Sequence, residues 1–438
     1  MKRTYFFTLL TAILLTFNAN STTYTSAANG NWMNFMTWSP FGVPIPGDII
    51  IINHAVALDT SFAYSTGSIT VNVGGSLIQN SPVRDIWLNG VNTAFTNNGT
   101  TTIRFMLLDA GSFNNTGMFN VKSFLNNITM NNSGTINGVD SMYNNNGTIN
   151  NVGTINIMTF FNQNIINNYG TIQGLTTVVD SMWNEGTFLN DAGAMLKADS
   201  ATNNGLFTNN GTVQYLQFTN YVSGTFINNN SLSFDDMTNF GTFTNNDVMT
   251  GANSMFNNEV FNNTSTGQIT LGVSFLNADT TSWTANFTNN GSVGIGDSYY
   301  NFNSVSGTSS GSFTVQDTSY NSGTMTGSFD FCDATPPPSY PYIDWNFGSI
   351  DATVTFCGLT TVTELDKSVF NIYPNPTTGI VNFGNQQQFV EVYSIDGKLL
   401  LEDFTNQLNI EKYNVGLYYL VVKDKEGNQL YKEKLIKQ

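Results

Sequence analysis

Basic residues are almost absent from most of this 438-residue chain. Charged residues of both signs make up only 10 % of it, and the formal net charge is −16. Between residues 22 and 363, twenty acidic residues stand against four basic ones, which are Arg84, Arg104, Lys122 and Lys197. A segment so poor in Lys and Arg cannot neutralise a phosphate backbone, which argues against nucleic acid and anionic membrane surfaces as partners.

A long hydrophobic run is also missing. The apolar run at residues 5–17 has about 13 residues, whereas a membrane-spanning helix needs about 20. Lys2 and Arg3 precede this run, and a small-residue site that ends at Ser21 follows it. These features predict a signal peptide over residues 1–21, cleavage after Ser21, and an exported mature protein.

Cysteine and histidine are scarce, with two cysteines and a single histidine in the chain. Cys332 and Cys357 lie 25 residues apart, and in an exported chain such a pair is expected to form a disulfide. The bond would contribute roughly 3–4 kcal/mol on the chain-entropy model. A metal site would need further Cys or His ligands, and His54 is far away in the sequence. We therefore expect no metal or other cofactor, and a structural role for His54 in a strand.

Asparagine and glycine, by contrast, recur along the middle of the chain. Variants of Asn-Asn-Gly-Thr occur in "NNGTTTI" (97–103), "NNSGTIN" (131–137), "NNYGTIQ" (167–173) and "NNGSVGI" (289–295). A second phrase, typically beginning Asp-Ser, recurs from Asp140 to Asp317 at one or two multiples of about 17–22 residues. Nine coils of about 20 residues would span that distance.

The period and the composition favour a β-solenoid. Apolar residues make up 40 % of the chain and aromatic ones 13 %, which indicates a packed core rather than a disordered polar tract. Helix formers are too few for helical repeats, and the period is too short for a propeller blade. We predict an all-β chain with a right-handed parallel β-helix over residues 85–331, preceded by an N-terminal cap and first coils over 22–84.

The two-residue alternation of a strand predicts which side chains face the core. The residues expected to point inward are Ile149, Ile155, Phe188, Met195, Phe207 and Val213. The neighbouring Thr and Asn should then point outward, and Asn-Gly should supply left-handed backbone at the corners. Stacking of the coils should align asparagines into hydrogen-bonded ladders.

Catalysis is not expected. A glycosidase needs two or three converging carboxylates, whereas acidic residues here recur at one register, as at Asp140, Asp180, Asp199 and Asp236. A lyase needs a Lys or Arg base, and the repeats contain few. We interpret the acidic column as turn residues, with Ca²⁺ between the coils as the less favoured alternative.

Three functions remain open for the solenoid besides an adhesin-like or structural one. The main alternative is a polysaccharide-degrading β-helix enzyme. A glycan-binding module would expose aromatic side chains on one face, and the residues to examine are Met142, Tyr143, Trp183 and Phe256. Outward Thr-x-Thr pairs such as Thr242-Phe243-Thr244 would be typical of an ice-binding solenoid.

The composition changes after a connecting segment at residues 332–363. Residues 364–438 are Lys-rich and non-repetitive, and they read as six or seven antiparallel strands with turns at Asp396-Gly397 and Glu426-Gly427-Asn428. The expected core residues are Val390, Val392, Leu400, Leu417, Leu420 and Val422. We predict a compact β-sandwich of about 70 residues.

Short motifs recur in order along this last segment. They are "YPNP" (Tyr373, Pro374, Asn375, Pro376) with Gly379, "SIDGK" with Asp396, Gly397 and Lys398, "GLYYL" with Gly416 and Tyr418, and the basic ending "KEKLIK". Together they resemble the type A C-terminal sorting domain of secreted Bacteroidetes-type proteins that use the type IX secretion system.

The resemblance implies an address for export. Such domains direct translocation by the outer-membrane secretion machinery, and a sortase-like protease usually removes them. The passenger is then attached to surface lipopolysaccharide or released. The sequence therefore predicts an exported cell-surface protein, adhesin-like or structural, whose solenoid acts on glycans or on the surfaces of host or other cells through its long regular face.

Overall fold

A computed structural model describes residues 21–438 except for 82, 175–178, 279–284, 336–341, 358–371, 384–386 and 424–428. The chain divides into two compact units, Met1–Phe356 and Cys357–Gln438. The predicted signal peptide lies outside the described residues apart from Ser21, so its cleavage site stays a prediction. Among the described residues, no helix is long and apolar enough to cross a membrane.

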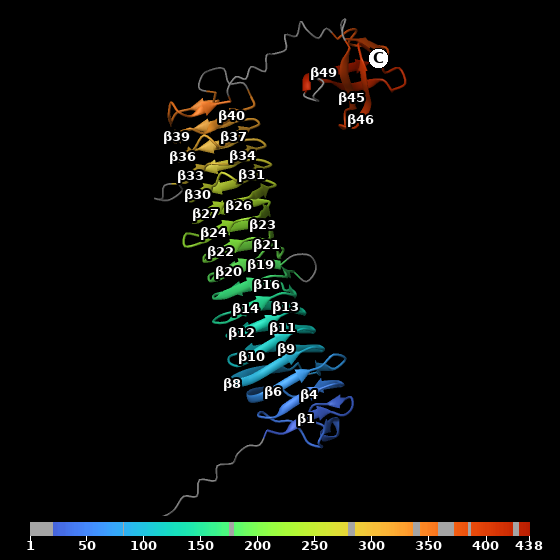
Figure 1. The fold of residues 1–438 in the computed structure, drawn as a ribbon, viewed down its shortest axis with the longest axis vertical. Coiled ribbons are helices and arrows are strands. Elements are labelled where there is room, and N and C mark those ends of the chain that lie inside the picture. The colour runs from blue at the N-terminus through green and yellow to red at the C-terminus, as the bar shows by residue number, and fades with distance from the viewer. Residues whose placement is uncertain are drawn as a thin grey trace, which may run out of the picture. The chain divides into compact units, whose positions relative to one another are not determined.

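The first unit is a parallel β-solenoid, as predicted (Figure 1). One coil illustrates the pattern. Its strands β14 (Thr148–Asn151), β15 (Thr154–Asn156) and β16 (Thr159–Asn162) lie on three successive faces, and β17 (Ile165–Asn168) then pairs in parallel with β14. Repetition of this step joins 43 strands into one continuous network.

The strands sort by face. On the first face lie β1 (Thr23–Ser26), β4 (Ile49–Ile52), β10 (Ser112–Asn115), β12 (Thr129–Asn132), β14, β17, β20 (Thr187–Asn190), β22 (Leu206–Asn209), β24 (Thr225–Asn228), β27 (Thr242–Asn245), β30 (Val260–Asn263), β33 (Asn286–Asn289), β36 (Ser304–Gly307), β39 (Thr324–Gly327) and β42 (Ser349–Ile350). On the second face lie β2 (Gly30–Asn31), β5 (Ala55–Leu58), β7 (Ser76–Gln79), β15, β18 (Thr171–Gln173), β25 (Ser231–Phe234), β28 (Val248–Gly251), β31 (Gln268–Leu271), β34 (Ser292–Ile295), β37 (Ser312–Val315), β40 (Asp330–Asp333) and β43 (Thr355–Phe356).

The third face carries the later strands of each coil. They are β16, β19 (Val179–Asn184), β26 (Asp236–Asn239), β29 (Met255–Asn257), β32 (Phe275–Asn277), β35 (Tyr299–Asn301), β38 (Ser319–Asn321) and β41 (Trp345–Asn346). Longer strands continue around a corner and serve two faces, namely β6 (Phe62–Val71), β8 (Asp85–Asn97), β9 (Thr100–Leu108), β11 (Met118–Asn126), β13 (Thr135–Asn144), β21 (Met195–Asn203) and β23 (Thr212–Asn220).

The N-terminal end of the stack is closed by aromatic packing. After the short helix η1 (Phe35–Thr37), β3 (Trp38–Ser39) pairs antiparallel with β1. Trp32 and Trp38 are buried with their rings 5.2 Å apart, and the Trp38 indole donates to the Trp32 carbonyl oxygen over 2.8 Å. Buried tryptophans thus cover the apolar interior where the stack begins.

Stacked aromatic rings fill much of the interior. The rings of five phenylalanines form a continuous stack, with successive centroids 4.6–4.9 Å apart and nearly parallel planes, at Phe188, Phe207, Phe226, Phe243 and Phe261. The prediction of inward residues is confirmed at Ile149, Ile155, Phe188, Phe207 and Val213, all buried. It is wrong at Met195, which is 38 % exposed because Leu196 takes the inward position of that strand.

Two columns of asparagine line the corners inside the stack. The first inner ladder contains Asn97, Asn115, Asn132, Asn151, Asn168, Asn190, Asn209, Asn228, Asn245, Asn263 and Asn289. The second inner ladder contains Asn126, Asn144, Asn162, Asn184, Asn203, Asn220, Asn239, Asn257, Asn277, Asn301 and Asn321. Within each, the side-chain amide donates to the amide oxygen of the next coil's asparagine over 2.7–2.9 Å.

The ladders confirm the predicted stacking. The asparagines beside the core residues point outward as predicted, and they form a further ladder through Asn131, Asn150 and Asn167. The asparagines of the two inner ladders point inward, where their amides also satisfy corner carbonyls outside the strand pairing, as Asn184 does for Gly186 and Leu206. Nine steps of the second inner ladder lead from Asn144 to Asn321, which confirms the predicted nine coils.

The repeat glycines have a different role from the one predicted. Gly153, in a typical Asn-x-Gly-Thr corner, is not among the glycines with a positive φ, so left-handed backbone is not its reason. A Cβ on Gly153 would instead lie 2.0 Å from the carbonyl oxygen of Gly134 in the preceding coil. Close stacking of one corner on the next therefore requires glycine there.

The described residues of the second unit form six strands in two antiparallel sheets. One contains β44 (Ile380–Asn382) and β47 (Gln407–Asn409), and the other has the order β46 (Leu399–Thr405), β45 (Gln388–Ser394), β48 (Gly416–Lys423) and β49 (Gln429–Lys437). Val390, Val392, Leu420 and Val422 are buried, and Leu400 packs against them. The prediction is wrong at Leu417, which is not in the core. Tyr418, and not Leu417, lies on the side of β48 that faces the core. The predicted turn at residues 426–428 lies outside the described residues.

Candidate functional sites

The "YPNP" motif of the second unit is held against its last strand. The Asn375 side chain donates to the Lys434 carbonyl oxygen over 2.7 Å and accepts from the Ile436 backbone amide over 2.9 Å. The backbone amide of Thr377 donates to the Ile436 carbonyl oxygen over 2.8 Å. One asparagine thus supplies both a donor and an acceptor to β49. Tyr373 itself is 50 % exposed, which leaves its ring available to a partner.

Gly379 marks a close approach within the same motif. A Cβ there would lie 2.2 Å from the Glu411 side chain, so any larger residue would displace the segment. Nearby, the Lys437 ammonium group donates to the carbonyl oxygens of Glu411 and Tyr413, and Lys437 is only 8 % exposed. The basic ending of the chain is therefore part of the fold.

The "SIDGK" motif is a hairpin turn between β45 and β46. Gly397 has a φ of +79°, which favours glycine, and its amide donates to the Ser394 carbonyl oxygen over 2.9 Å. The Ser394 hydroxyl donates to the Asp396 carboxylate, and this bond lowers the pKa of Asp396. Asp396 and Lys398 are both exposed.

Gly416 begins β48, and Tyr418 fixes the turn before it. The Tyr418 ring is buried, and its hydroxyl donates to the Asn414 carbonyl oxygen over 2.6 Å. The predicted motif residues therefore do not converge on one chemical centre. They fix the termini and turns of one small sandwich, as an address read by its shape would require.

The second unit also carries a charged cluster that the sequence did not predict. Glu391 accepts from the Lys423 ammonium group over 2.6 Å and from the Tyr393 hydroxyl over 2.7 Å. Burial acts to raise the pKa of Glu391, but the hydrogen bonds from Lys423 and Tyr393 outweigh it, so the pKa is lowered. These residues line a cavity of about 580 Å³ with Tyr419 and Lys432.

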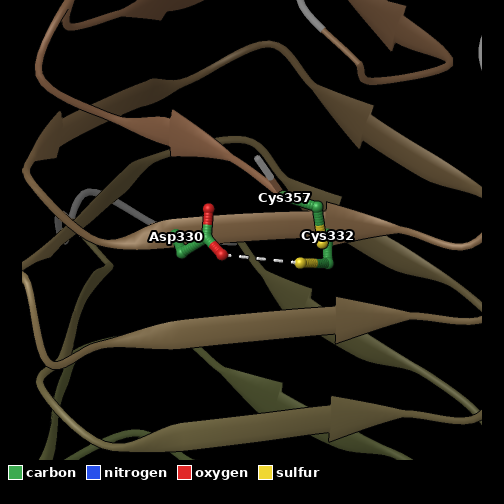
Figure 2. Close-up of side chains that lie close together, drawn as sticks. All are labelled: Asp330, Cys332 and Cys357. Atoms are coloured by element: carbon green, nitrogen blue, oxygen red, sulfur yellow. Dashed lines mark hydrogen bonds between the residues drawn. The ribbon is translucent and has the colours of Figure 1, made fainter. Parts of the chain in front are cut away.

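The predicted disulfide is confirmed, since both cysteines are disulfide-bonded (Figure 2). Parallel pairing of β40 with β43 places Phe331 opposite Phe356, and so brings Cys332 beside Cys357. The Cys332 sulfur also lies 3.7 Å from a carboxylate oxygen of Asp330. Within the described residues, these three form the only group with metal-ligand spacing, and the disulfide leaves neither sulfur free to bind a metal.

The acidic column is less regular than the sequence indicated. Asp199 aligns with Leu216 in the next coil, and the backbone amide of Asp235 donates to the Leu216 carbonyl oxygen. Asp235 therefore occupies the column position, and the predicted Asp236 lies one residue further on in β26. Asp140 pairs instead with Lys122 at 3.4 Å. The Asp180 side chain lies outside the described residues.

The structure places His54 elsewhere than predicted. It lies in the corner between β4 and β5 rather than within a strand. Its Nδ1 atom is 2.8 Å from the Ser26 carbonyl oxygen.

One outward register position of the third face carries large apolar side chains along most of the solenoid. Strand pairing aligns the members of this outer row, which are Trp87, Leu107, Leu125, Tyr143, Phe161, Trp183, Thr202, Thr219, Thr238, Phe256, Leu276, Tyr300, Tyr320 and Trp345. Trp87, Tyr143 and Trp183 are 41 %, 44 % and 39 % exposed. Of the residues singled out for inspection, only Met142 is in the core.

Ring contacts make the outer row continuous across its three threonines. Trp183 stacks on Tyr221 with centroids 6.1 Å apart, and Phe240 links Tyr221 to Phe256 at 6.4 and 6.1 Å. Tyr221 and Phe240 lie on the adjacent corner, one residue after an inner-ladder asparagine. The repeated phrase that typically begins Asp-Ser marks part of this row, because its fourth residue is a row member, as at Tyr143, Trp183 and Phe256. Members outside that phrase, such as Trp87 and Leu107, are aligned only by strand register.

Polar side chains flank the outer row at the same corner. Asp109, Asn127, Asn145, Gln163 and Glu185 form this corner row. Asn127 donates to Asp109 over 2.8 Å, and Gln163 donates to Glu185 over 3.0 Å. The indole N–H groups of Trp87 and Trp183 donate to Asp109 and Glu185 over 3.2 and 3.1 Å, which fixes the orientation of both rings.

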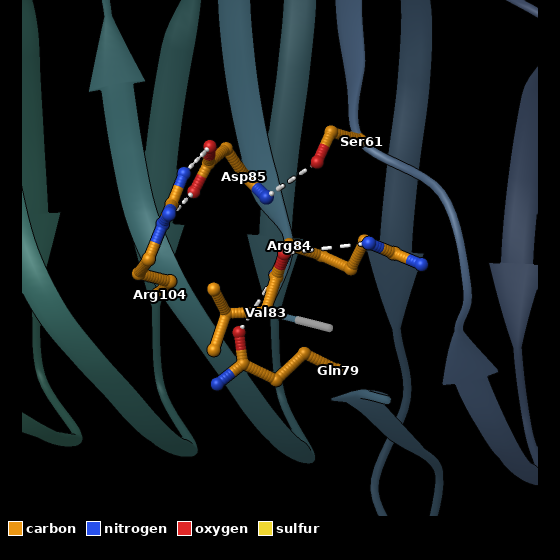
Figure 3. Close-up of polar contacts among 6 residues, drawn as sticks. All are labelled: Ser61, Gln79, Val83, Arg84, Asp85 and Arg104. Atoms are coloured by element: carbon orange, nitrogen blue, oxygen red, sulfur yellow. Dashed lines mark hydrogen bonds and ion pairs between the residues drawn. The ribbon is translucent and has the colours of Figure 1, made fainter. Parts of the chain in front are cut away.

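A shallow cavity of about 360 Å³ adjoins the first member of the outer row. Phe62, Trp87, Phe105 and Leu107 are among its apolar walls. Asp85 lies at its rim, where its carboxylate accepts from Nε, over 2.8 Å, and from Nη2 of the Arg104 guanidinium (Figure 3). The Asp85 backbone amide also donates to the Ser61 hydroxyl over 3.0 Å, so the rim is ordered from two coils.

Comparison with known proteins identifies the second unit but not the solenoid. No curated protein and no solved structure matches the chain. Residues 371–438 match the family model described as a secretion system C-terminal sorting domain, and they include every predicted motif residue of the second unit. The tail engages the type IX secretion machinery, and the protein is therefore exported to the cell surface or the extracellular space as a β-solenoid carrying a type IX sorting domain.

Proposed function

We propose that the solenoid is an adhesin-like surface module. It binds its ligand through the third face and does not act as an enzyme. The observation that carries the proposal is the outer row, because a contiguous, partly exposed apolar stripe on an exported protein marks an interaction site. The rest of the surface offers less. On the first face, Thr242 and Thr244 are followed in the next coil by Val260 and Asn262, so no uniform ice-binding array forms.

Attachment assays on the native host test this proposal. Cells lacking the protein should adhere less to their natural surfaces or partner cells than the wild type, and added purified protein should compete with wild-type attachment. Unchanged attachment in both assays would refute an adhesin-like role and leave a purely structural one.

We further propose that a sortase-like protease removes the sorting module after export and that the passenger is attached to surface lipopolysaccharide, as the resemblance implies. Intact mass measurement of the surface form should then give a C-terminus upstream of residue 372. A surface form that retains Gln438 would contradict this processing.

The alternative of a polysaccharide-degrading enzyme has one specific observation in its favour. Lys197, Asp199 and Asp235 line a cavity of about 440 Å³ where the second and third faces meet. We expect no release of reducing ends from polysaccharides by the purified chain. Release that is abolished by Lys197→Ala would make this cavity an active site.

A further inference from the structure

The outer row has the form of a track rather than of a patch. Its members come from successive coils, which parallel strands hold about 4.8 Å apart. The row is one side chain wide, and ordered polar side chains border it. On one side is the corner row from Asp109 to Glu185, and on the other are hydroxyl groups such as those of Ser141, Thr159 and Ser181.

This form does not fit a folded protein partner. A stable protein interface buries about 800 Å² on each partner around a broad apolar core, which a single file of side chains does not provide. A second copy of this chain is disfavoured further by charge, because residues 22–363 carry twenty acidic and four basic residues. The same charge disfavours anionic lipid headgroups.

An extended sugar chain fits the track. Each sugar ring has an apolar C–H surface and a rim of hydroxyl groups. The apolar surface would pack on the rings of Tyr143, Phe161 and Trp183, while the hydroxyl groups would exchange hydrogen bonds with the corner row. Asp109 and Glu185 would repel a carboxylated or sulfated chain, so the sugar is uncharged.

The rings are also held before any ligand arrives. Trp87 and Trp183 are each tied to a carboxylate through the indole N–H. The inner ladders fix the backbone beneath them. Binding would therefore cost little conformational entropy in the protein.

We propose that a neutral polysaccharide chain binds along the outer row, over the segment from Trp87 to Trp183, parallel to the axis of the solenoid. This inference rests on the proposed adhesin-like function and names the class of its ligand. The cavity beside Trp87 would accept one end of the bound segment.

Affinity electrophoresis of the purified full-length chain in cellulose derivatives, xylan, mannan, laminarin and, as the acidic control, alginate tests the proposal. The wild type should be retarded by at least one neutral polysaccharide and not by alginate. Tyr143→Ala and Trp183→Ala should each weaken that binding about tenfold, which equals about 1.4 kcal/mol. Tyr169→Ala is the matched control, because Tyr169 is 45 % exposed and lies outside the outer row. It should change affinity less than twofold.

Binding to no neutral polysaccharide, equal binding to alginate, or equal effects of the Tyr143 and Tyr169 variants would overturn the inference. Circular dichroism of each variant checks that the fold is intact. Host attachment separates this failure from failure of the proposed function. If the double variant Tyr143→Ala/Trp183→Ala still supports normal attachment, the protein is an adhesin but the outer row is not its ligand site.

Discussion

The inner ladders make a sharp stability prediction at two adjacent asparagines in β24 and the turn after it. Asn228 is fully buried, and its side-chain amide donates to Asn245, to the Asn230 carbonyl oxygen and to the Val248 carbonyl oxygen over 2.8, 2.9 and 3.0 Å. Its own amide oxygen accepts from Asn209 over 2.8 Å. The two amide hydrogens are shared among three acceptors, so Asn228→Ala removes the equivalent of three hydrogen bonds, two donated and one accepted.

The magnitude follows from that count. A typical hydrogen bond contributes about 1 kcal/mol net, and water cannot reach the orphaned groups, so Asn228→Ala should cost about 3 kcal/mol. Asn229→Ala is the matched control. Asn229 donates to Asn210 over 2.8 Å and accepts from Asn246 over 2.6 Å, but these contacts are exposed. Its loss should cost at most about 0.5 kcal/mol.

Hydrogen exchange and urea unfolding of the full-length chain provide the assay. Because each coil contacts only its neighbours, the loss at Asn228 should appear as faster exchange in β24 and β27, with the distant coils unchanged. Asn228→Asp should be as damaging, because it keeps the shape but replaces the donor with a buried carboxylate. If the variants at 228 and 229 are equally stable, the inner ladders contribute no more to the stability of the stack than the exposed asparagines do.

Three further predictions concern the last coils of the solenoid and the sorting module. Cys332→Ser should destabilise the last coils by roughly 3–4 kcal/mol, seen as faster hydrogen exchange in β40 and β43. Reduction of the wild-type disulfide should have the same effect. Unchanged exchange in these strands would refute a stabilising role of the disulfide. Asn375→Ala removes the donor and the acceptor that hold the "YPNP" segment to β49. The backbone amides of that segment should then exchange faster, and less protein should reach the cell surface. Full export of the variant would show that this contact is dispensable. The sorting module should also lose stability in acid. The pKa of Glu391 in the folded protein lies below its unfolded value of about 4.3. Its contribution to the free energy of unfolding is therefore present above that pH and lost as the pH falls through the folded pKa. Glu391→Gln should flatten this pH dependence in urea unfolding measured from pH 6 to 3.

Local sequence was enough to predict the strands, the period and the sorting module. Ile149 and Phe207 face inward because a strand alternates, and that rule needs no tertiary information. The turn at Gly397 could be predicted because a positive φ favours glycine wherever it occurs. At Leu417 the prediction failed, since residues 417 and 420 have opposite parity and only one of them can face the core.

What the tertiary structure alone decided is the vertical alignment of one coil on the next. Successive ladder residues are separated by as few as 17 and as many as 26 residues, so sequence spacing cannot align the members of a column. The repeated phrase that typically begins Asp-Ser is the exception, because its fourth residue supplies the outer-row members Tyr143, Trp183 and Phe256. Outside that phrase only strand register aligns the outer row, as it does for Trp87 and Leu107. The sequence determines which residues form a coil. Strand register across coils decides which side chains become neighbours, because hydrogen bonding between strands does not depend on the length of the turns that join them.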